Sequence, residues 1–515
     1  LASLAGIDVL RDGGSAGDAA IAANLVLGVV WPHMCGPGGD LFAQVWSSAD
    51  RKLYGLNASG RAGSGMSGEA YRARGVTRMP IRGALSITVP GAVDGWFSLH
   101  QRFGRLDMQR IARDAIHYAR DGFRVTPFTA GAIRAGGELL AKLGDGADVF
   151  LPGGRAPSAG DVLVHADLAD TLELIAREGA SAMYHGPLGE RIVDFLAANG
   201  AGLTSADFAA QRSEWVEPVS VNYRGVDVFQ IPPNSQGIAL LEMLNMLDGV
   251  DLTAWDPYSA ESVHQLVERK KLAFADRDAH VADPASVDVP LGMLLDRPRS
   301  LQRAAQISSR AAPSRPRSVG RSVDGDTIYL CAADRDGNVV SLIQSLFAAF
   351  GSGVHVPGTG ITMHNRGFGF TLLEGHPNEL APGKRPMHTL MPGMAFRAGQ
   401  PWLAFGTRGA DGQPQTGLQV LNGLLDFDLD LQAAVEAPRW AHGAPGGRFP
   451  ASALVVESRF GDALAEDLAA RGDEVMLADA VDPVMGTVQM IQVDQSRGCF
   501  VASTDPRGDG VALAV

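Results

Sequence analysis

The chain has 515 residues, of which 46% are hydrophobic and 20% are charged, and its formal net charge is -13 at pH 7. These values are typical of a globular protein with a large buried core. The negative charge argues against a nucleic-acid partner, which would require a basic face, although it leaves room for a local basic pocket. The apolar run at residues 19–31 is too short to span a bilayer, so we expect no membrane partner.

Cys35, Cys331 and Cys499 are widely spaced and form no CxxC pair. This spacing argues against a disulfide framework and against a structural zinc site, so we expect no metal. No signal peptide is visible, and the cysteine usage fits a reducing compartment. We therefore expect a cytoplasmic protein.

Predicted helices alternate with short strands over the first 300 residues. Residues 15–30 have Ser and Asp start signals and a continuous apolar body, which predicts a buried helix. Residues 31–46 are a Gly/Pro loop that runs into a strand. Residues 106–123 have apolar residues at helical spacing before a Gly, and residues 259–281 predict another long amphipathic helix.

The composition changes at residues 308–326, which are rich in Ser, Arg, Pro and Gly. We expect this stretch to be an exposed, mobile connector, and a plain linker between two domains is the simplest reading of it. Residues 327–334 and 338–347 then read as two strands, and the Asp-Gly between them is a strong hairpin signal. Thr327 is therefore expected at the first residue of a strand.

A Thr hydroxyl is a weak nucleophile unless a base lies beside it. The α-amino group of an N-terminal Thr can be that base, because its pKa of about 7.7 to 8.0 suits proton transfer near neutrality. Cleavage between Asp326 and Thr327 would supply nucleophile and base together. The alternative is that Thr327 simply favours a β conformation.

Several ordered segments give the chain a resemblance to the γ-glutamyltranspeptidase family of N-terminal nucleophile hydrolases. They are GGSAGDAAIAANLVLGVVWPHMCGPGGDLF (13–42), ITVPGAVDGW (87–96), IPPNSQGIALLEMLNML (231–247), LVERKKLAFADRDAHVADP (266–284), DTIYLCAADRDGNVVSL (326–342), FGSGVHVPGTGI (350–361), APGKRPMHTLMP (381–392) and FGTRGADGQPQT (405–416). Each segment is a weak motif alone, and their number and order carry the resemblance.

The resemblance implies an α+β fold, a four-layered αββα sandwich, and an acyl-enzyme chemistry that uses no cofactor. It also implies self-cleavage into a large portion, 1–326, and a small portion, 327–515. The two portions are expected to remain associated in one fold unit as a heterodimer, which could dimerise further.

The resemblance also implies roles for single residues. Thr327 corresponds to the nucleophile, and Ser345 to a hydroxyl that contacts the new chain terminus. Gly409 and Ala410 correspond to the backbone donors of an oxyanion hole, a role that depends on N–H groups rather than side chains. Arg61 corresponds to the guanidinium that binds a substrate carboxylate; an isolated Arg in a Gly/Ser loop would otherwise be read as a surface residue.

The chain departs from the family pattern where γ-glutamyl enzymes hold the substrate ammonium and carboxylate with Asn, Gln, Asp and a Ser pair. The corresponding substrate-binding positions are Phe347, Arg366, Gly369, His388 and Thr389. No acid remains among them to pair with an ammonium, and Arg366 would repel one. We therefore expect γ-glutamyl compounds to be poor substrates.

A site that binds a substrate carboxylate but no ammonium favours a short acid that carries an amide, such as oxamate. The family segments quoted above most resemble the oxamate amidohydrolase branch. Two other branches stay open: glutaryl cephalosporin acylases and enzymes of antibiotic biosynthesis that cleave an amide or a carbon–carbon bond. An alternative of another class is an uncleaved relative that only binds a carboxylate, since Ile328 follows the nucleophile where many relatives carry a small residue. No G-x-S-x-G or HExxH motif supports a serine or zinc hydrolase.

Overall fold

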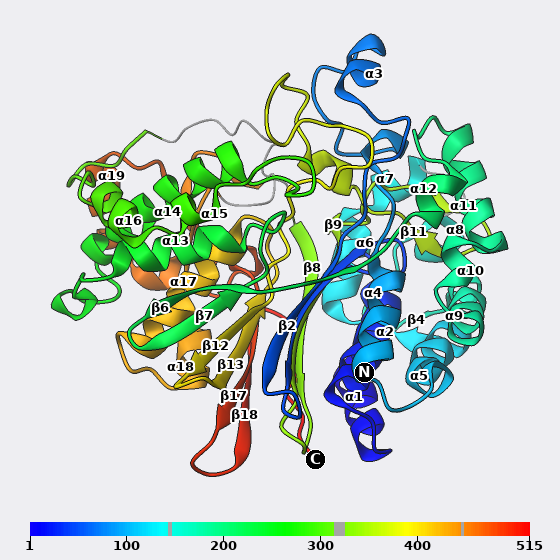
Figure 1. Ribbon diagram of the computed structural model, residues 1–515, viewed down its shortest axis with the longest axis horizontal. Coiled ribbons are helices and arrows are strands. Elements are labelled where there is room, and N and C mark those ends of the chain that lie inside the picture. Colours follow the sequence, from blue (N-terminus) through cyan, green and yellow to red (C-terminus); the bar gives the residue numbers. More distant parts are fainter. Residues whose placement is uncertain (143–146, 314–324, 444–447) are drawn as a thin grey trace. The chain divides into compact units, whose positions relative to one another are not determined.

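The computed structural model describes residues 1–142, 147–313, 325–443 and 448–515 (Figure 1). The chain divides into two compact units, and each is described by itself. The first unit contains Leu1–Val216, Asp326–Pro386 and Leu513–Val515. The second unit contains Glu217–Gly325 and Met387–Ala512.

The first unit is built on a five-stranded sheet in the order β5-β2-β1-β9-β8. Its strands are β1 (Asp40–Ser47), β2 (Lys52–Ala58), β5 (Glu214–Val216), β8 (Gly325–Ala333) and β9 (Val339–Ala348). The central strand β1 pairs antiparallel with both β2 and β9. In the second of these ladders Asp40 lies opposite Ser345. The start of β1 is therefore fixed beside the predicted terminus-binding hydroxyl.

Helices of the first unit pack on this sheet and on one another. The helices are α1 (Ala2–Arg11), α2 (Ala16–Val30), α3 (Gly68–Ala73), α4 (Ala92–Phe103), α5 (Met108–Asp121), α6 (Pro127–Ala135), α7 (Gly137–Lys142), α8 (Ala147–Phe150), α9 (Ala166–Glu178), α10 (Ser181–Tyr184), α11 (Pro187–Ala198) and α12 (Ser205–Ala209). The short elements are η1 (Ala84–Ser86), η2 (Pro152–Gly154), η4 (Arg366–Gly369), β3 (Phe123–Arg124), β4 (Val162–Leu163), β10 (His355–Val356) and β11 (Ile361–Thr362).

A buried polar chain fixes α2 and α4 to β9. Asn24 on α2 donates from Nδ2 to Gln344 Oε1 at 3.3 Å, and its Oδ1 accepts from the Trp96 indole on α4 at 2.6 Å. These groups are buried, so losing one partner would leave the other without a hydrogen bond, at a cost of about 1–3 kcal/mol. The helix layer is thereby held in register with the strand that carries Ser345.

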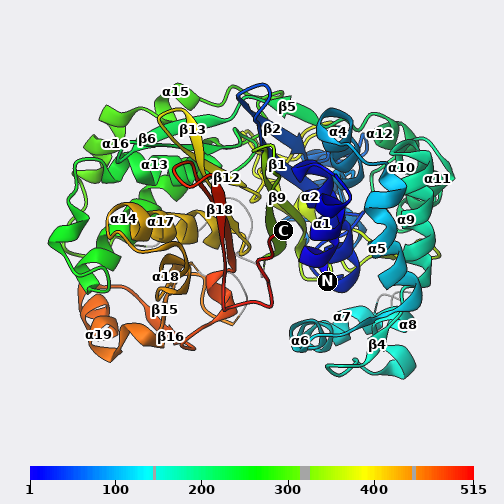
Figure 2. The same cartoon turned by 90° about the horizontal axis from the view of Figure 1, so that it is seen from below.

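The second unit is built on a six-stranded sheet in the order β18-β17-β13-β12-β7-β6 (Figure 1), and Figure 2 shows the helices α13, α14 and α17 of the same unit. Its strands are β6 (Val219–Tyr223), β7 (Val226–Gln230), β12 (Gly393–Arg397), β13 (Gln400–Thr407), β17 (Val488–Asp494) and β18 (Cys499–Thr504). A small sheet contains β14 (Trp440–His442), β15 (Leu454–Glu457) and β16 (Val475–Ala478). The helices are α13 (Gly237–Leu247), α14 (Ala260–His280), α15 (Leu291–Leu294), α16 (Arg297–Ala304), α17 (Gly412–Leu425), α18 (Leu431–Glu436) and α19 (Asp462–Arg471), with short turns η3 (Leu252–Ala254), η5 (Ser458–Phe460) and η6 (Pro483–Met485).

The core of the second unit lies between this sheet and a helical layer in which α13 contacts α14, α16 and α17. Leu240 and Leu244 of α13, Leu418 of α17 and Leu403 of β13 are fully or almost fully buried in one cluster. Burying each such side chain stabilises the fold by about 1.5–3 kcal/mol. The apolar continuity of residues 237–247 in the sequence therefore reflects a helix that is covered on all sides.

The local sequence signals predicted the main elements correctly. The helix expected at 15–30 is α2, and Ser15 and Asp18 form its capping box. The helices expected at 106–123 and 259–281 are α5 and α14, and the strand expected after the Gly/Pro loop is β1.

The predicted hairpin around Asp-Gly is also present, since β8 ends at Ala333 and β9 begins at Val339. One boundary was wrong: β8 begins at Gly325, so Thr327 is the third residue of the strand. The apolar pattern starts at Thr327, whereas the extended backbone already includes the two residues before it. Most of the predicted connector, residues 314–324, lies outside the described residues.

Within the described part of the chain, no helix is both long enough and apolar enough to cross a bilayer. The three cysteines are free thiols: Cys35 is buried, Cys331 is half-buried and Cys499 is exposed.

Candidate active site

The hydroxyl of Ser345 is the centre of the candidate site in the first unit. Thr327 Oγ1 donates to Ser345 Oγ at 3.1 Å, and Ser345 Oγ donates to the carbonyl oxygen of Asp326 at 2.8 Å. The Phe347 N–H also donates to Ser345 Oγ, at 2.6 Å. Thr327 and Ser345 are both buried. One serine therefore touches the predicted nucleophile and the carbonyl of the peptide bond that precedes it.

The predicted substrate-binding residues Phe347 and Arg366 contact each other. The Arg366 guanidinium lies 4.3 Å from the centre of the Phe347 ring. Burial lowers the pKa of Arg366 to about 9, although the negative charge of Asp40 opposes the shift. Gly369 closes η4, the short turn that begins with Arg366. This part of the site therefore presents a cation on an aromatic ring.

Phe347 has a backbone φ of 80°, which a bulky L-residue rarely adopts. Such a conformation costs on the order of 1–3 kcal/mol and is kept only when its surroundings enforce it. The hydrogen bond from the Phe347 N–H to Ser345 is one such constraint. The strain lies two residues after Ser345, where the strand β9 is about to end.

Asp40 connects the glycine loop and β1 to this cluster, and the sequence reasoning did not assign it. Asp40 Oδ1 accepts from the N–H groups of Gly60 and Gly91, each at 3.0 Å. Asp40 also lies opposite Ser345 in the sheet. The loop that carries Arg61 is thus linked to the strand that carries Ser345.

His364 lies beside Asp40, with 3.7 Å between its Nδ1 and Asp40 Oδ2, and both side chains are fully buried. Its Nε2 lies 2.9 Å from the carbonyl oxygen of Thr88, so Nε2 carries a proton and donates it there. Burial lowers the pKa of His364, despite the nearby Asp40 charge. The ring is therefore a neutral structural donor near neutral pH.

Arg61 already binds a carboxylate of the protein. Its Nη1 donates to the carbonyl of Gly383 at 3.0 Å, and its Nη2 lies 2.8 Å from Glu214 Oε1. The same Glu214 oxygen lies 2.8 Å from Arg385 Nη1. Burial raises the pKa of Glu214, but the hydrogen bonds and charges of Arg385 and Arg61 outweigh it, and the net pKa is lowered. Arg61 is therefore oriented in a manner suited to a carboxylate, and Glu214, which is 46% exposed, was missed by the sequence reasoning.

Gly409 and Ala410 lie in the second unit, directly before α17. Their backbone φ angles are 117° and 44°. Thr407 Oγ1 donates to the Arg408 carbonyl at 3.0 Å, and the Gly412 N–H donates to the Gly409 carbonyl at 2.6 Å. Because a carbonyl and the next N–H share one rigid plane, these two bonds fix the directions of the Gly409 and Ala410 N–H groups. The segment has the properties of a preorganised pair of donors.

His388 and Thr389 also lie in the second unit and are buried. The His388 N–H donates to the Asn234 carbonyl at 2.8 Å, and the imidazole Nδ1 accepts from the Leu390 N–H at 3.2 Å. The backbone bond thus holds the segment 388–390 against the turn before α13, and the imidazole bond fixes the shape of the segment itself.

The predicted site residues therefore fall into two groups. Ser345 brings together Asp326, Thr327 and Phe347, and Phe347 in turn holds Arg366; Arg61 lies in the same unit, on the loop bound by Asp40. The second unit holds His388, Thr389, Gly409 and Ala410. Among the described residues, no three His, Cys, Asp or Glu side chains gather as they would around a metal ion.

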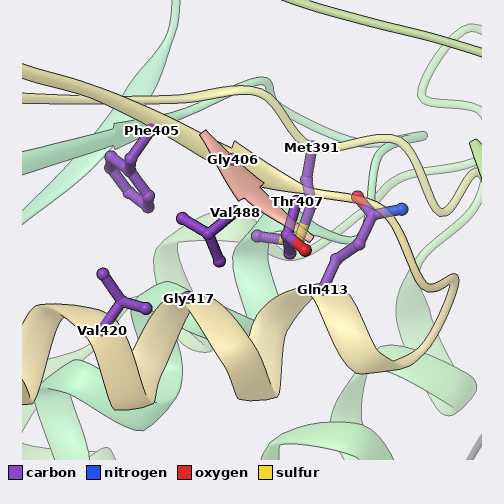
Figure 3. A pocket seen from close by; sticks show the side chains of 8 residues that line it. All are labelled: Met391, Phe405, Gly406, Thr407, Gln413, Gly417, Val420 and Val488. Carbon is purple, nitrogen blue, oxygen red and sulfur yellow. The ribbon is translucent and has the colours of Figure 1, made fainter. Parts of the chain in front are cut away.

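One pocket in the second unit lies between β13, β17 and α17 (Figure 3). Figure 3 shows Thr407 and Gln413 near the side chain of Met391, with Val488 in the middle of the pocket and Phe405 and Val420 at its other end. The space for the centre of a water molecule is about 10 Å³. That is the room that a single buried water needs, so this pocket is not a substrate site.

The family model named Gamma-glutamyltranspeptidase matches residues 2–515. The chain belongs to the γ-glutamyltranspeptidase family. It is 43% identical over 516 residues to the Glutathione hydrolase-like YwrD proenzyme of Bacillus subtilis (strain 168), with 100% of this chain and 97% of the relative covered. It is 36% identical to the Oxamate amidohydrolase proenzyme of Klebsiella pneumoniae, with 99% and 96% covered.

Among solved structures, the chain is similar to the cephalosporin acylase from Bacillus halodurans. The identity is 39%, the TM-score is 0.92, and 99% of this chain and 93% of the acylase are covered. The expected fold class is confirmed: the chain combines helices and sheets and closely matches this acylase, an N-terminal nucleophile hydrolase. The chain is an enzyme of this family, of the amidohydrolase and acylase type.

Proposed function

We propose that the chain cleaves itself between Asp326 and Thr327, and that the new N-terminal Thr327 then hydrolyses a small amide that carries a carboxylate. The observation that carries the proposal is the position of Ser345, whose hydroxyl contacts both Thr327 Oγ1 and the Asp326 carbonyl oxygen. The large portion is then 1–326 and the small portion 327–515, associated as a heterodimer.

Self-cleavage begins when Thr327 Oγ1 attacks the carbonyl carbon of Asp326 and its proton is taken up by the departing nitrogen. The C–N bond breaks, an ester joins Asp326 to the Thr327 oxygen, and water hydrolyses that ester to a carboxylate and a free hydroxyl. Negative charge develops on the Asp326 oxygen during the attack. The hydrogen bond from Ser345 stabilises this charge where it forms.

In turnover the α-amino group of Thr327 accepts the hydroxyl proton while Oγ1 attacks the substrate amide. The N–H groups of Gly409 and Ala410 receive the oxyanion, and the amine part of the substrate leaves with the proton. Water then hydrolyses the acyl-enzyme. The fixed carbonyls of Arg408 and Gly409 support this role, because donors that need no reorganisation stabilise a transition state most strongly.

The proposed substrate is an oxamate-like acid amide, with Phe347, Arg366, His388 and Thr389 as its further neighbours. Arg61, already paired with Glu214, supports recognition of a carboxylate. The cation of Arg366 on the Phe347 ring disfavours a substrate ammonium. The similarity to an oxamate amidohydrolase agrees with this choice.

A second candidate is an acylase that releases a dicarboxylic side chain from a larger amine. The similarity to a cephalosporin acylase favours it, and the same nucleophile and donors would serve. A third reaction, cleavage of a carbon–carbon bond beside a carbonyl, would begin with the same addition to a carbonyl carbon.

The test is an intact mass of the purified protein after incubation at neutral pH, with N-terminal sequencing of the fragments and Thr327→Ala as the control. Two fragments, the smaller beginning Thr-Ile-Tyr-Leu, are expected from the natural chain and none from the variant. The cleaved protein is then assayed with oxamate, a glutaryl cephalosporin and glutathione. Hydrolysis of oxamate with little hydrolysis of glutathione is expected. A chain that stays whole and inactive would overturn the proposal in favour of a carboxylate-binding relative.

A further inference from the structure

Gln236 is the residue that joins the two predicted site segments of the second unit. Its Nε2 donates to the Thr389 carbonyl at 2.9 Å and to the Ala410 carbonyl at 2.8 Å. Its Oε1 accepts from Arg277 Nη1 at 2.8 Å. Only an NH₂ group can serve two carbonyls, and only an oxygen can accept from a guanidinium, so this amide has one possible orientation.

Arg277 fixes the Gln236 amide by donating to its oxygen. It lies in the last turn of α14, has no exposed side-chain surface, and also donates from Nη1 to Asp411 Oδ1 at 3.0 Å. Burial lowers the pKa of Arg277, but Asp278 and Asp411 outweigh burial and the net pKa is raised, so the guanidinium keeps its charge. Gln236 and Asp411 are therefore two branches of one buried network, and both reach the segment that contains Ala410.

Three consecutive backbone carbonyls, those of residues 408–410, each accept a hydrogen bond. Those of Arg408 and Gly409 accept from Thr407 Oγ1 and the Gly412 N–H. That of Ala410 accepts from Gln236 at 2.8 Å and, over a longer distance of 3.2 Å, from the Gln413 N–H. Ala410 has a φ of 44°, which costs an L-residue roughly 1–2 kcal/mol. A flip of the peptide plane before Ala410 would relieve this strain and would turn its N–H away. Fixing the planes on both sides of Ala410 opposes that flip.

We infer that Gln236 is a positioning residue of the reaction, which keeps the Ala410 N–H directed as an oxyanion donor and ties it to the Thr389 segment. This inference rests on the proposed roles of Gly409 and Ala410. Gln236 touches neither the substrate nor the nucleophile in this account. It acts through the backbone of two other residues, so its removal should slow the chemical step more than it weakens binding.

Gln236→Glu is the sharpest variant, because it keeps the shape and the bond to Arg277 but places a second oxygen against two carbonyl oxygens. Gln236→Met keeps the volume and removes all three hydrogen bonds. The matched control is Gln419→Glu on α17, whose Nε2 also bridges two carbonyls, those of Gln415 and Trp440, at 3.0 Å each. The control carries the same chemical change at a site that does not touch residues 408–411.

Intact mass first establishes whether each variant is cleaved, and the kcat and KM for oxamate and a glutaryl anilide are then measured. A small phosphonofluoridate, scored by its mass on the small fragment, gives a second readout that needs no turnover and still needs an oxyanion site. We expect both Gln236 variants to be cleaved like the natural chain, because Ser345 serves the Asp326 carbonyl. Their kcat and labelling rate should fall by about 10- to 100-fold, whereas KM should change by less than about 3-fold. This fall in kcat is somewhat smaller than the fall caused by losing an oxyanion donor itself.

Three outcomes would overturn the inference. The first is that the natural chain is active and a cleaved Gln236 variant has the same kcat and labelling rate. The proposed function would then hold without the inference about Gln236. The second is an equal loss of kcat in Gln419→Glu, which would mark a general effect of disturbing the unit. The third is a natural chain that is neither cleaved nor labelled, which removes the proposed function together with the inference.

Discussion

The hydroxyl of Ser345 contacts both Thr327 Oγ1 and the Asp326 carbonyl oxygen. In the proposed self-cleavage the second partner is lost with the peptide bond, whereas Thr327 Oγ1 remains. Under this proposal, Ser345 acts first on the chain itself and later on the nucleophile. This double contact gives Ser345 a testable role in self-cleavage.

Ser345→Ala should slow self-cleavage by at least about 10-fold, because the developing charge on the Asp326 oxygen loses its hydrogen-bond donor. The rate is measured from the loss of the uncut mass with time. Ser345→Thr should restore most of the rate, since it keeps the hydroxyl. The matched control is Ser341→Ala, because Ser341 lies on the same strand as Ser345 and its hydroxyl is hydrogen-bonded to Tyr329 instead. This variant should be cleaved normally. Equal rates for Ser345→Ala and the natural chain would contradict this role.

Arg61→Gln should raise the KM for a carboxylate-bearing amide by about 10- to 100-fold, because a charge-assisted pair is worth roughly 1.5–3 kcal/mol. Self-cleavage should be unaffected, since Arg61 does not contact Asp326 in the proposed reaction. Arg72→Gln removes another Arg of the first unit, one that pairs with Glu379, and is the control. The proposal for Arg61 fails if both variants show the same KM.

The end of a strand, a turn and the start of a helix define the candidate oxyanion segment of the second unit. The chain leaves β13 at Thr407, passes through two residues with positive φ, and enters α17 at Gly412. The N-terminus of a helix favours negative charge in its neighbourhood. The geometry of the segment is thus a property of the strand, the turn and the helix together.

Gly409→Ala should lower kcat by at least about 10-fold, because a φ of 117° is strained for any residue with a side chain and the turn would rearrange. Space does not cause the effect, since the nearest atom to the added methyl group would be 3.8 Å away. Gly417→Ala on α17 is the control: its methyl group would make ordinary contacts from 3.4 Å, and it should leave kcat unchanged. The strain argument is refuted if Gly409→Ala retains full kcat.

Glu242 on α13 makes the stability of the second unit depend on pH. Burial, and then the charge of Asp276, raise its pKa well above the ordinary value against the opposing Arg303 and Arg299. The folded state therefore binds a proton that the unfolded chain has lost, so stability falls as pH rises above the ordinary Glu pKa towards the raised one. Within that window the free energy of unfolding should fall by about 1.4 kcal/mol per pH unit from this group.

Glu242→Gln should remove that pH dependence. The melting temperature of the variant, relative to that of the natural chain, should therefore increase as pH rises from 5 to 8. The melting temperatures are measured at each pH. The control is Glu466→Gln, which changes an exposed glutamate on α19. Parallel curves for the natural chain and Glu242→Gln would show that this carboxyl does not titrate in the window.

At the scale of the whole molecule, the proposed cleavage point does not separate the two compact units. In the first unit, β1 precedes the cut and pairs with β9, which follows it. In the second unit, β7 precedes the cut and pairs with β12, which follows it. Each sheet is therefore assembled from both portions of the chain.

The two fragments should consequently elute together in size-exclusion chromatography, at low salt and in about 1 M NaCl alike, because strand ladders and buried surface are little affected by ionic screening. Separation should require a denaturant. A control run of the uncut Thr327→Ala chain shows where the 54.1 kDa protein elutes. Dissociation of the fragments in buffer would contradict the strand pairing.

Local signals explain why part of this structure could be predicted from the sequence. The capping residues Ser15 and Asp18 and the Asp-Gly hairpin act over a few residues, so α2 and the β8–β9 turn follow directly from the chain. Gln236 could not be assigned in this way, since its partners Thr389 and Ala410 lie 153 and 174 residues away. The pairing of Arg61 with Glu214 is equally non-local.

The order of strands in the first sheet has a practical consequence for how such a protein can be made. β8 is an edge strand, so opening the chain before Thr327 leaves every interior ladder of that sheet intact. Residues 1–326 and 327–515 could then be translated from two separate genes, with a starting methionine removed from the second product by an aminopeptidase. An active enzyme assembled in this way would show that peptide cleavage serves only to release an amine, and that the covalent link between the halves is needed for neither folding nor catalysis.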